Sequence, residues 1–395
     1  MKTEKEHIDN IRSKFSALRS KEDLVSLLNE AKVLLYGEDF KPIRLKSLTY
    51  YANPEICKSR YTSFKIKKKS GGERIINAPV KGLRSILRVV NFVLQCIHEP
   101  HKAATGFVQE RSIVDNARVH VGRHYVYNLD LKDFFHSFDR NRVKMGFWME
   151  PFNLRDEKEP IAFLLASLCT HPFNIEGEKK TVLPQGSPTS PTITNILCYK
   201  LDRRLNGLAK KFNLSYTRYA DDITFSSSHN IYKDEAFQKE LNRIIVEDQG
   251  LKINQKKVRN QNLAIRQEVT GLVVNDKVNV HRKYIKQLRM WLYYWEKYGY
   301  NKAEQLFRQD YAAEKGHIKT KRPKMSTVIA GKLEFLKMVK GIEDSTYLRL
   351  KERFDGLRTS NATKIVNIDL ERVVDTILNS GLYEGVALYD RLKNS

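Results

Sequence analysis

The feature that most constrains this sequence is a pair of adjacent carboxylates, Asp221 and Asp222, between two runs of strand-forming residues. A third carboxylate, Asp130, closes a similar run upstream, at residues 125–130. Magnesium prefers hard oxygen ligands and usually keeps water and substrate phosphates, so a few carboxylates on stiff strand ends suit it. The three aspartates therefore predict a centre for two Mg²⁺ ions that performs in-line phosphoryl transfer. Asp130 and Asp221 would bridge the ions, and Asp222 would support the site.

An Asp-Asp pair in a hairpin is, taken alone, more often ordinary turn chemistry, because Asp favours turns and caps. Three further features favour catalysis. They are an Asp-x-x-Asp-Phe-Phe segment, a Gln-Gly-Ser-Pro loop and a basic hairpin tip, at residues 130–135, 185–188 and 67–74. The loop feeds a helix, for which we expect Ser190 as the N-cap and Pro191 as the first helical residue.

The charge of the chain predicts a polyanionic partner. Its 395 residues include 70 Lys and Arg against 46 Asp and Glu, a formal net charge of +24. Such an excess attracts nucleic acid and makes the binding salt-dependent. An anionic membrane surface would attract it too, but no apolar run approaches the length of a bilayer span and the N-terminus lacks the apolar segment of a secretory signal. We therefore expect a soluble cytoplasmic protein that binds nucleic acid and no membrane.

Periodicity and turn residues indicate the fold class. Residues 1 to about 60 are predicted to be helical, with Ser20 and Asp23 forming a capping box. The alternating segment 64–79 breaks at a Gly-Gly pair, which predicts a β-hairpin with a basic tip. Strand and helix patterns interleave from about 125 to 280. An α+β fold follows.

These segments resemble, in order, the motifs of the reverse transcriptase family. The segments similar to its four motifs are Asn128–Phe135, Leu183–Pro191, Tyr219–Asp222 and Gly250–Lys257. The likeness runs from about residue 60 to 290, and ordered agreement of this kind is highly specific. It implies RNA-directed DNA synthesis with two Mg²⁺ ions on a right-hand polymerase fold of the reverse transcriptase type. The implied parts are an N-terminal helical extension (1–60), fingers (61–124), a palm (125–280, with about 140–182 contributing to the fingers) and a helical RNA-binding thumb (281–395).

The resemblance also implies roles for individual residues. Asp130, Asp221 and Asp222 match the catalytic, metal-binding aspartates. Residues matched to contacts with the incoming nucleotide are Lys68, Lys69, Arg74, Asp133, Phe134, Phe135, Gln185 and Lys257. Phe135 would block a ribose 2′-hydroxyl and Arg74 would grip the triphosphate with its bidentate fork. Some of these have simpler alternatives, because Phe134 could be a core residue, Lys257 a surface charge and the hairpin tip a solvated loop.

Two short segments are similar to signatures of one branch, the retron enzymes. They are Asn116-Ala-Arg-Val-His120 and Val269-Thr-Gly271. The likeness implies a cognate structured noncoding RNA that serves as template and primer and is bound in part by Asn116 and His120. DNA synthesis would start from the 2′-hydroxyl of an internal guanosine, consume dNTPs and leave an RNA–DNA hybrid with the RNA joined to the DNA (msDNA). It further implies antiphage defence with an accessory effector protein.

Simpler interpretations of these signatures stay open. His120 could be a satisfied core histidine and Gly271 a turn glycine. The chain could also be another bacterial reverse transcriptase, of the group II intron, diversity-generating or unclassified defence type. From a different class, it could be a non-catalytic RNA-binding scaffold that keeps a polymerase fold.

Beyond residue 280, basic and aromatic residues recur with helical spacing, interrupted by a basic linker at 315–324. The residues predicted to bind RNA there are Arg282, Lys283, Tyr284, Lys286 and Arg289. They lead into Trp291, Tyr293, Tyr294 and Trp295, on which unpaired bases could stack. The alternative is an amphipathic helix whose aromatic side chains form core, and both can hold for different faces.

Overall fold

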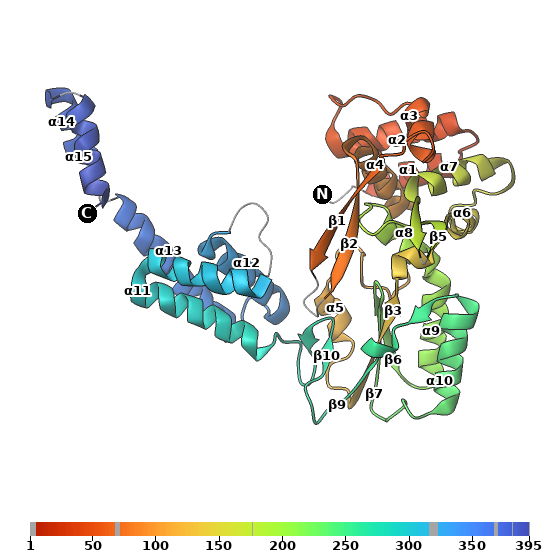
Figure 1. Ribbon diagram of the computed structural model, residues 1–395. Coiled ribbons are helices and arrows are strands. Elements are labelled where there is room, and N and C mark those ends of the chain that lie inside the picture. The colour runs from red at the N-terminus through yellow and green to blue at the C-terminus, as the bar shows by residue number, and fades with distance from the viewer. Residues whose placement is uncertain are drawn as a thin grey trace. The chain divides into compact units, whose positions relative to one another are not determined.

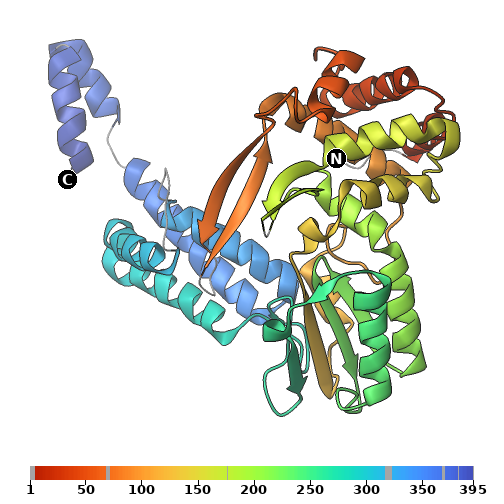
Figure 2. The same cartoon turned by 45° about the vertical axis from the view of Figure 1, so that its right-hand side comes forward.

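The chain folds into two compact units, Met1–Val278 and Asn279–Ser395, which we call the first unit and the second unit. The computed structural model describes residues 5–67, 72–175, 177–315, 323–366, 370–380 and 382–394. Figures 1 and 2 show the first unit as mixed helix and sheet, whereas the described part of the second unit is helical. The predicted α+β class is thereby confirmed. The limits of fingers, palm and thumb stay predictions.

The first unit begins with a helical layer. Its helices are α1 (Lys5–Ser16), α2 (Lys21–Tyr36), α3 (Leu45–Ala52) and α4 (Lys81–Ile97). Ser20 Oγ accepts the Asp23 backbone N–H at 3.1 Å, and the Asp23 carboxylate accepts the Ser20 N–H at 2.9 Å, so the predicted capping box is confirmed. The apolar faces of α1 and α2 pack against α4, which buries Leu24 and Leu28.

A long β-hairpin precedes α4. Strands β1 (Tyr61–Lys67) and β2 (Glu73–Pro79) pair antiparallel over their whole length, as predicted. At the base of the hairpin, buried Arg60 donates from Nη2 to the carbonyls of Ser167 and Leu168, at 3.0 and 2.9 Å. The tip, including Lys68 and Lys69, lies outside the described residues.

A five-stranded antiparallel sheet forms the centre of the first unit, in the order β6-β7-β3-β8 with β9 also paired to β3. The strands are β3 (Tyr125–Lys132), β6 (Ser215–Tyr219), β7 (Asp222–Ser227), β8 (Lys252–Ile253) and β9 (Arg259–Asn262). Helices α9 (Tyr199–Lys211) and α10 (Glu235–Asn242) run along one face of this sheet in Figure 1. Phe225 of β7 contacts Phe237 of α10, with ring centroids 5.5 Å apart. The sheet is therefore anchored through its apolar face, which leaves strand ends available for polar groups.

Shorter elements complete the first unit. The helices are α5 (Ile113–Arg118), α6 (Arg140–Trp148), α7 (Glu159–Cys169) and α8 (Ser190–Leu197). Two further hairpins pair β4 (His171–Ile175) with β5 (Glu178–Val182) and β10 (Glu268–Val269) with β11 (Leu272–Val273). Single helical turns are η1 (Phe134–Ser137), η2 (Asp156–Lys158) and η4 (Gln255–Lys257), and η3 (Arg243–Asp248) is a π-helical extension of α10.

The start of α8 corrects one prediction. The N-cap is Thr189 rather than Ser190, and Ser190 is the first helical residue. The Ser190 hydroxyl donates instead to the Pro184 carbonyl, at 2.8 Å. A tertiary contact within the preceding loop therefore takes the hydroxyl that the sequence assigned to capping.

The second unit contains α11 (Arg282–Lys315), α12 (Met325–Lys340), α13 (Ser345–Val366), α14 (Leu370–Ser380) and α15 (Leu382–Asn394). Helix α11 is kinked at Gly299, whose φ is +76°. Trp291 and Trp295 are buried, and they pack against Phe307 and Phe354 respectively. Most of the linker predicted at 315–324 lies outside the described residues. Within the described ranges, every helix is too short or too polar to cross a membrane.

Candidate active site

The pairing of β3 with β7 brings the three predicted carboxylates together. Asp130 lies directly opposite Asp222 in the antiparallel register, and the Leu131 N–H donates to the Asp221 carbonyl at 3.0 Å. Directly opposed residues of an antiparallel pair point to the same face of the sheet, with Cβ atoms about 4.5–5.5 Å apart. Positions far apart in the chain thus meet at one end of the sheet.

A two-residue turn, Ala220-Asp221, joins β6 to β7 at this end. Ala220 has φ +57°, in the left-handed region that residues with a Cβ rarely adopt. The adjacent segment passes so close that a Cβ on Gly106 would lie 2.5 Å from the Ala220 nitrogen. The turn is therefore strained and closely packed, as is common at functional sites.

Burial, together with neighbouring negative charge, raises the pKa of the Asp221 and Asp222 carboxylates. Burial is the largest cause for Asp222, followed by the carboxylates of Asp221 and Asp130, and together they raise its pKa to about 6. Burial and the Asp130 carboxylate likewise raise the pKa of Asp221. Such crowding is the electrostatic condition that a bound cation relieves.

The Asp130 carboxylate already has cationic and amide partners. Its Oδ1 accepts Lys257 Nζ at 2.6 Å, and its Oδ2 accepts Asn254 Nδ2 at 3.1 Å. Asn254 also donates its backbone N–H to the Asp130 carbonyl at 2.8 Å, which fixes the fourth motif to β3. Lys257 is thus an exposed charge that is also paired with Asp130, so its nucleotide role stays a prediction. Asn254 is a site residue that the sequence reasoning missed.

The carboxylate oxygens are suitable ligands for a divalent cation, although the side chains are not yet close enough together to form a metal-binding group. In the part of the chain that the structure describes, no three His, Cys, Asp or Glu side chains are grouped as a metal-binding set. Three hard carboxylate oxygen donors at one end of the sheet nevertheless fit magnesium chemistry. An ion that binds at Asp130 would share the carboxylate with Lys257 and Asn254 or displace them.

The Gln-Gly-Ser-Pro loop is attached to the β1–β2 hairpin. The Gln185 carbonyl accepts the Asn77 N–H at 2.7 Å. Gly186 has φ +123°, and a Cβ there would lie 2.7 Å from the Asn77 carbonyl oxygen. Glycine is therefore required at 186, and the loop is held against β2 with the Gln185 side chain half-buried.

Three aromatic residues near the carboxylates have different environments. Phe134 is only 4% exposed and packs on Phe138 in the core, so its predicted nucleotide contact is replaced by a packing role. Phe135 is half-buried, and its ring centroid is 6.3 Å from that of Phe107. Phe107 is 40% exposed and also lies 6.5 Å from the Tyr219 ring. The sequence reasoning missed Phe107, because an apolar loop residue gave no signal.

The remaining predicted nucleotide contacts are peripheral or undescribed. Arg74 is exposed on β2, and its charge contributes to lowering the pKa of Asp221 against the larger effect of burial. Asp133 is exposed and has φ +49°, with its carboxylate 3.9 Å from Lys132 Nζ. Lys68 and Lys69 belong to the undescribed tip.

His120 is fully buried, which corrects its predicted contact with RNA. Its Nδ1 and Nε2 each lie 2.7 Å from a hydroxyl, Ser226 Oγ on β7 and Thr217 Oγ1 on β6. Burial lowers the pKa of the imidazole to about 3, so it is neutral at physiological pH. Both ring nitrogens are satisfied within the protein, so the core-histidine alternative is the one that the structure supports.

Asn116 is buried in the same region, so its predicted contact with RNA is corrected as well. Thr105 Oγ1 donates to Asn116 Oδ1 at 2.8 Å, and Asn116 Nδ2 donates to Thr270 Oγ1 at 3.4 Å. Thr270 and Gly271 form the β10–β11 turn, with φ +48° and +80°. The two signature segments therefore contact each other and support the sheet from within.

In the second unit, Arg282, Lys283, Lys286 and Arg289 are exposed on α11. Tyr284 is half-buried and donates its hydroxyl to the Lys332 carbonyl at 2.9 Å. Its role is therefore mainly to pack α11 on α12. The two faces of α11 differ as the sequence allowed, with Trp291 buried and Tyr293 exposed.

Comparison with known proteins agrees with this geometry. The family model described as "Reverse transcriptase (RNA-dependent DNA polymerase)" matches residues 66–279. The chain is 35% identical over 293 residues to the retron Mx162 reverse transcriptase of Myxococcus xanthus, which covers 69% of this chain and 60% of that protein. It is 36% identical over 248 residues to the retron Mx65 enzyme of the same organism, covering 59% and 55%.

The retron Ec86 reverse transcriptase of Escherichia coli is 32% identical over 234 residues, which cover 58% of this chain and 68% of that protein. The match thus spans a little over half the length of the two Myxococcus proteins. Because the family model covers more than half of the chain and these relatives share a single description, the chain belongs to the reverse transcriptase family, in its retron branch.

Proposed function

We propose that this protein is the RNA-directed DNA polymerase of a retron, which copies part of a cognate structured noncoding RNA into DNA. The observation that supports this most strongly is the register of β3 and β7, which sets Asp130 opposite Asp222 and beside Asp221. The order of the motifs in the chain and the retron relatives point to the same reaction.

The three carboxylates supply the site for metal ions. The reverse transcriptase family generally depends on divalent metal ions. We assign Asp130, Asp221 and Asp222 as the ligands of two Mg²⁺ ions, which when bound activate the attacking hydroxyl and neutralise charge on the triphosphate. The raised pKa of Asp222 supports this role, because crowded carboxylates gain most from a nearby cation.

Residues around the carboxylates position the nucleotide. Lys257 is a cation beside Asp130 that can turn to the triphosphate and offer a proton to the leaving pyrophosphate. Phe135 is half-buried, and its ring makes an edge contact with the ring of Phe134. Its bulk suits exclusion of a ribose 2′-hydroxyl. Arg74 brings a bidentate donor from β2 for the phosphates, and the half-buried amide of Gln185 can bond the sugar.

The RNA supplies both template and primer in this proposal. The exposed cations of α11 meet its phosphates, and the partly exposed Tyr293 and Tyr298 offer rings for unpaired bases. Synthesis starts from the 2′-hydroxyl of an internal guanosine and yields RNA-linked DNA. The proposal includes an accessory effector and a role in antiphage defence, which the retron branch favours.

Primer extension on purified protein tests the polymerase activity. Asp221→Asn keeps the side-chain volume but removes a ligand charge, so we expect nucleotide incorporation to fall by at least about 1,000-fold. The matched control is Asp276→Asn, which changes an exposed aspartate in the same unit and should retain wild-type rates. Equal incorporation by wild type and Asp221→Asn would contradict catalysis and favour a non-catalytic scaffold.

Sequencing the nucleic acid that co-purifies with the protein tests the retron assignment. We expect one RNA, encoded next to the gene, joined through a guanosine 2′-oxygen to a DNA copy of part of itself. Debranching should release the DNA with a free 5′ end. Recovery of intron RNA, or of DNA without a branch, would favour another class of bacterial reverse transcriptase.

A further inference from the structure

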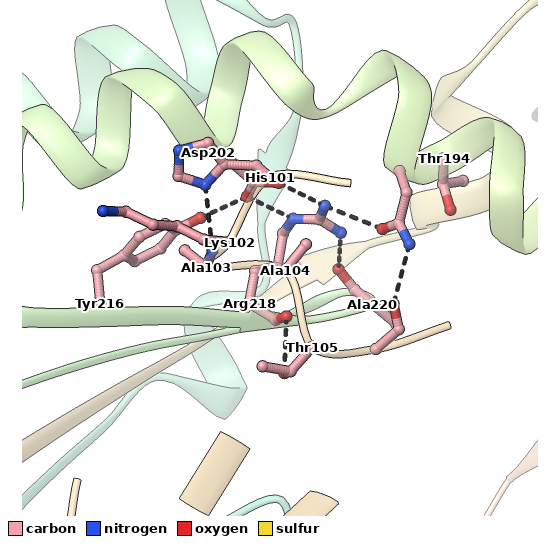
Figure 3. A network of polar contacts seen from close by, with 12 residues as sticks. His101, Lys102, Ala103, Ala104, Thr105, Thr194, Asp202, Tyr216, Arg218 and Ala220 are labelled. Carbon is pink, nitrogen blue, oxygen red and sulfur yellow. Dashed lines mark hydrogen bonds and ion pairs between the residues drawn. The ribbon is translucent and has the colours of Figure 1, made fainter. Parts of the chain in front are cut away.

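A buried ion pair lies directly beneath the catalytic turn. Arg218 of β6 donates from Nε to Asp202 Oδ1 and from Nη2 to Asp202 Oδ2, both at 2.7 Å. Both side chains are completely buried. Figure 3 shows Arg218 between Asp202, which comes from α9, and Ala220 of the turn.

Such a pair is costly to bury unless each charged group is fully bonded. Here Tyr216 donates its hydroxyl to Asp202 Oδ1 at 2.7 Å, and Arg218 Nη2 also donates to Asn195 Oδ1 at 3.0 Å. The remaining terminal nitrogen, Nη1, donates to the Ala220 carbonyl at 3.1 Å. The guanidinium thus links two helices, through Asp202 of α9 and Asn195 of α8, to the turn at Ala220.

The hydrogen bond from Arg218 reaches the carbonyl of Ala220, whose backbone conformation is strained. The Ala220 carbonyl belongs to the peptide that leads into Asp221, and Ala220 itself has φ +57°. Rotation of this peptide would break the bond from Arg218 and move the start of Asp221. Arg218 therefore opposes relaxation of the strained turn.

A second contact restrains the turn from the amide side. The segment 103–106 runs along β6, where the Arg218 N–H donates to the Ala103 carbonyl and the Thr105 N–H to the Arg218 carbonyl, both at 2.8 Å. Asn195 Nδ2 donates to the Gly106 carbonyl at 3.0 Å. Gly106 lies so close to the turn that a Cβ added to it would be 2.5 Å from the Ala220 nitrogen.

We propose that Arg218, fixed by Asp202 and Asn195, is a positioning residue that holds the Ala220–Asp221 peptide in its strained orientation and thereby places Asp221 for metal binding. The inference rests on the proposed function. Arg218 touches neither metal nor substrate and acts through the peptide bond that precedes the ligand. We call the three side chains the turn clamp.

Arg218→Lys tests the turn clamp, because lysine keeps the charge but cannot bond Asp202 in two places and also reach Ala220. A misplacement of about 1 Å can cost about 100-fold in rate, so we expect kcat to fall about 10- to 100-fold. KM for primer–template should stay within about twofold. Arg243→Lys is the matched control, since Arg243 makes a bidentate pair with Glu240 on the surface and should be unaffected.

Two further measurements separate positioning from simple loss of stability. Binding of Mn²⁺ in the absence of nucleotide, followed by electron paramagnetic resonance, should weaken about fivefold or more in Arg218→Lys. Adding Ala220→Gly, which removes the strain at φ +57°, should restore much of kcat and Mn²⁺ affinity without restoring the midpoint of urea unfolding. Asn195→Ala, which keeps the ion pair, should show the same pattern with a smaller loss if Arg218→Lys does not fold.

The proposal is overturned if Arg218→Lys and Asn195→Ala bind Mn²⁺ as wild type does, or if Ala220→Gly restores nothing while both variants are merely less stable. Failure of the proposed function would look different. Wild-type protein would then incorporate no nucleotide, yet the comparison of Mn²⁺ affinities between wild type and Arg218→Lys would still report on the turn clamp.

Discussion

Two polar clusters lie along strands β6 and β7, and they differ in charge and in how fully their polar groups are hydrogen-bonded. At the turn end, Asp221 and Asp222 repel each other and Asp130, and their pKa values are raised. Further along the same strands, Thr217 and Ser226 hold His120, which is neutral and bonded through both ring nitrogens. At the turn end, Lys257 offsets only part of the crowded negative charge, which suits the metal ions that we propose, whereas the hydrogen bonds around His120 are satisfied within the fold.

The contrast also changes the meaning of the retron signatures. Asn116 and His120 had been expected to contact RNA, but both are buried with partners from the protein. Thr105 connects the signature residue Asn116 to Arg218 of β6, since its hydroxyl donates to Asn116 and its backbone N–H to the Arg218 carbonyl. These two signature residues therefore support the fold beside the Ala220–Asp221 turn from buried positions.

The largest expected effect comes from removing the satisfied histidine. His120→Ala leaves a cavity and two buried hydroxyls without their partner, so we expect the free energy of unfolding to fall by about 2–4 kcal/mol. Denaturant unfolding gives this value. Because His120 is buried, incorporation should fall equally with the self-primed RNA and with an annealed DNA primer. A loss confined to the self-primed RNA would break the contrast and restore an RNA-binding role.

A smaller effect should locate RNA binding in the second unit. Arg282, Lys286 and Arg289 share one face of α11 and are exposed. Replacing all three by Gln should weaken binding of the cognate RNA about 10- to 30-fold and flatten its dependence on salt, because three phosphate contacts are lost. Fluorescence anisotropy at several salt concentrations measures both quantities.

The control for this test replaces three exposed cations elsewhere in the second unit, Lys302, Lys324 and Arg349, by Gln. Both triple variants lose the same charge, so a reduction confined to the α11 variant shows that position matters. Equal weakening by the two variants would mean that net charge, rather than this helix face, attracts the RNA.

The smallest effect concerns the pH dependence of stability. A carboxyl group whose folded pKa is raised opposes folding above that pKa and ceases to do so as the pH falls below its unfolded value. Since the pKa of Asp222 is about 6 in the folded protein, metal-free Asp222→Asn should be more stable than wild type by roughly 1–2 kcal/mol at pH 7.5. The difference should shrink between about pH 6 and pH 4. A difference that does not change with pH would show that the pKa of Asp222 is not raised in the folded protein.

Much of the site was accessible from local patterns. The Ser20–Asp23 capping box, the β1–β2 hairpin and the meeting of Asp130 with the Asp221–Asp222 pair all agree with the structure. These features depend on residue types at short spacing or on motifs that occur in a fixed order. The predicted nucleotide role of Phe134 was replaced because an aromatic side chain has the same sequence signal in a core as at a site.

The sequence by itself determined the helices, the hairpins, the cationic character and the order of the acidic motifs, because periodicity, turn chemistry and charge act locally or as simple sums. Only the tertiary structure decided which polar groups are satisfied. The partners of Arg218, His120 and Asp130 come from other elements, and those of His120 and Asp130 lie about a hundred residues away in the chain. Burial and hydrogen-bond satisfaction depend on contacts between elements that are distant in the chain. They distinguish the crowded carboxylates at the end of β6 and β7 from the fully bonded His120 beside the same two strands.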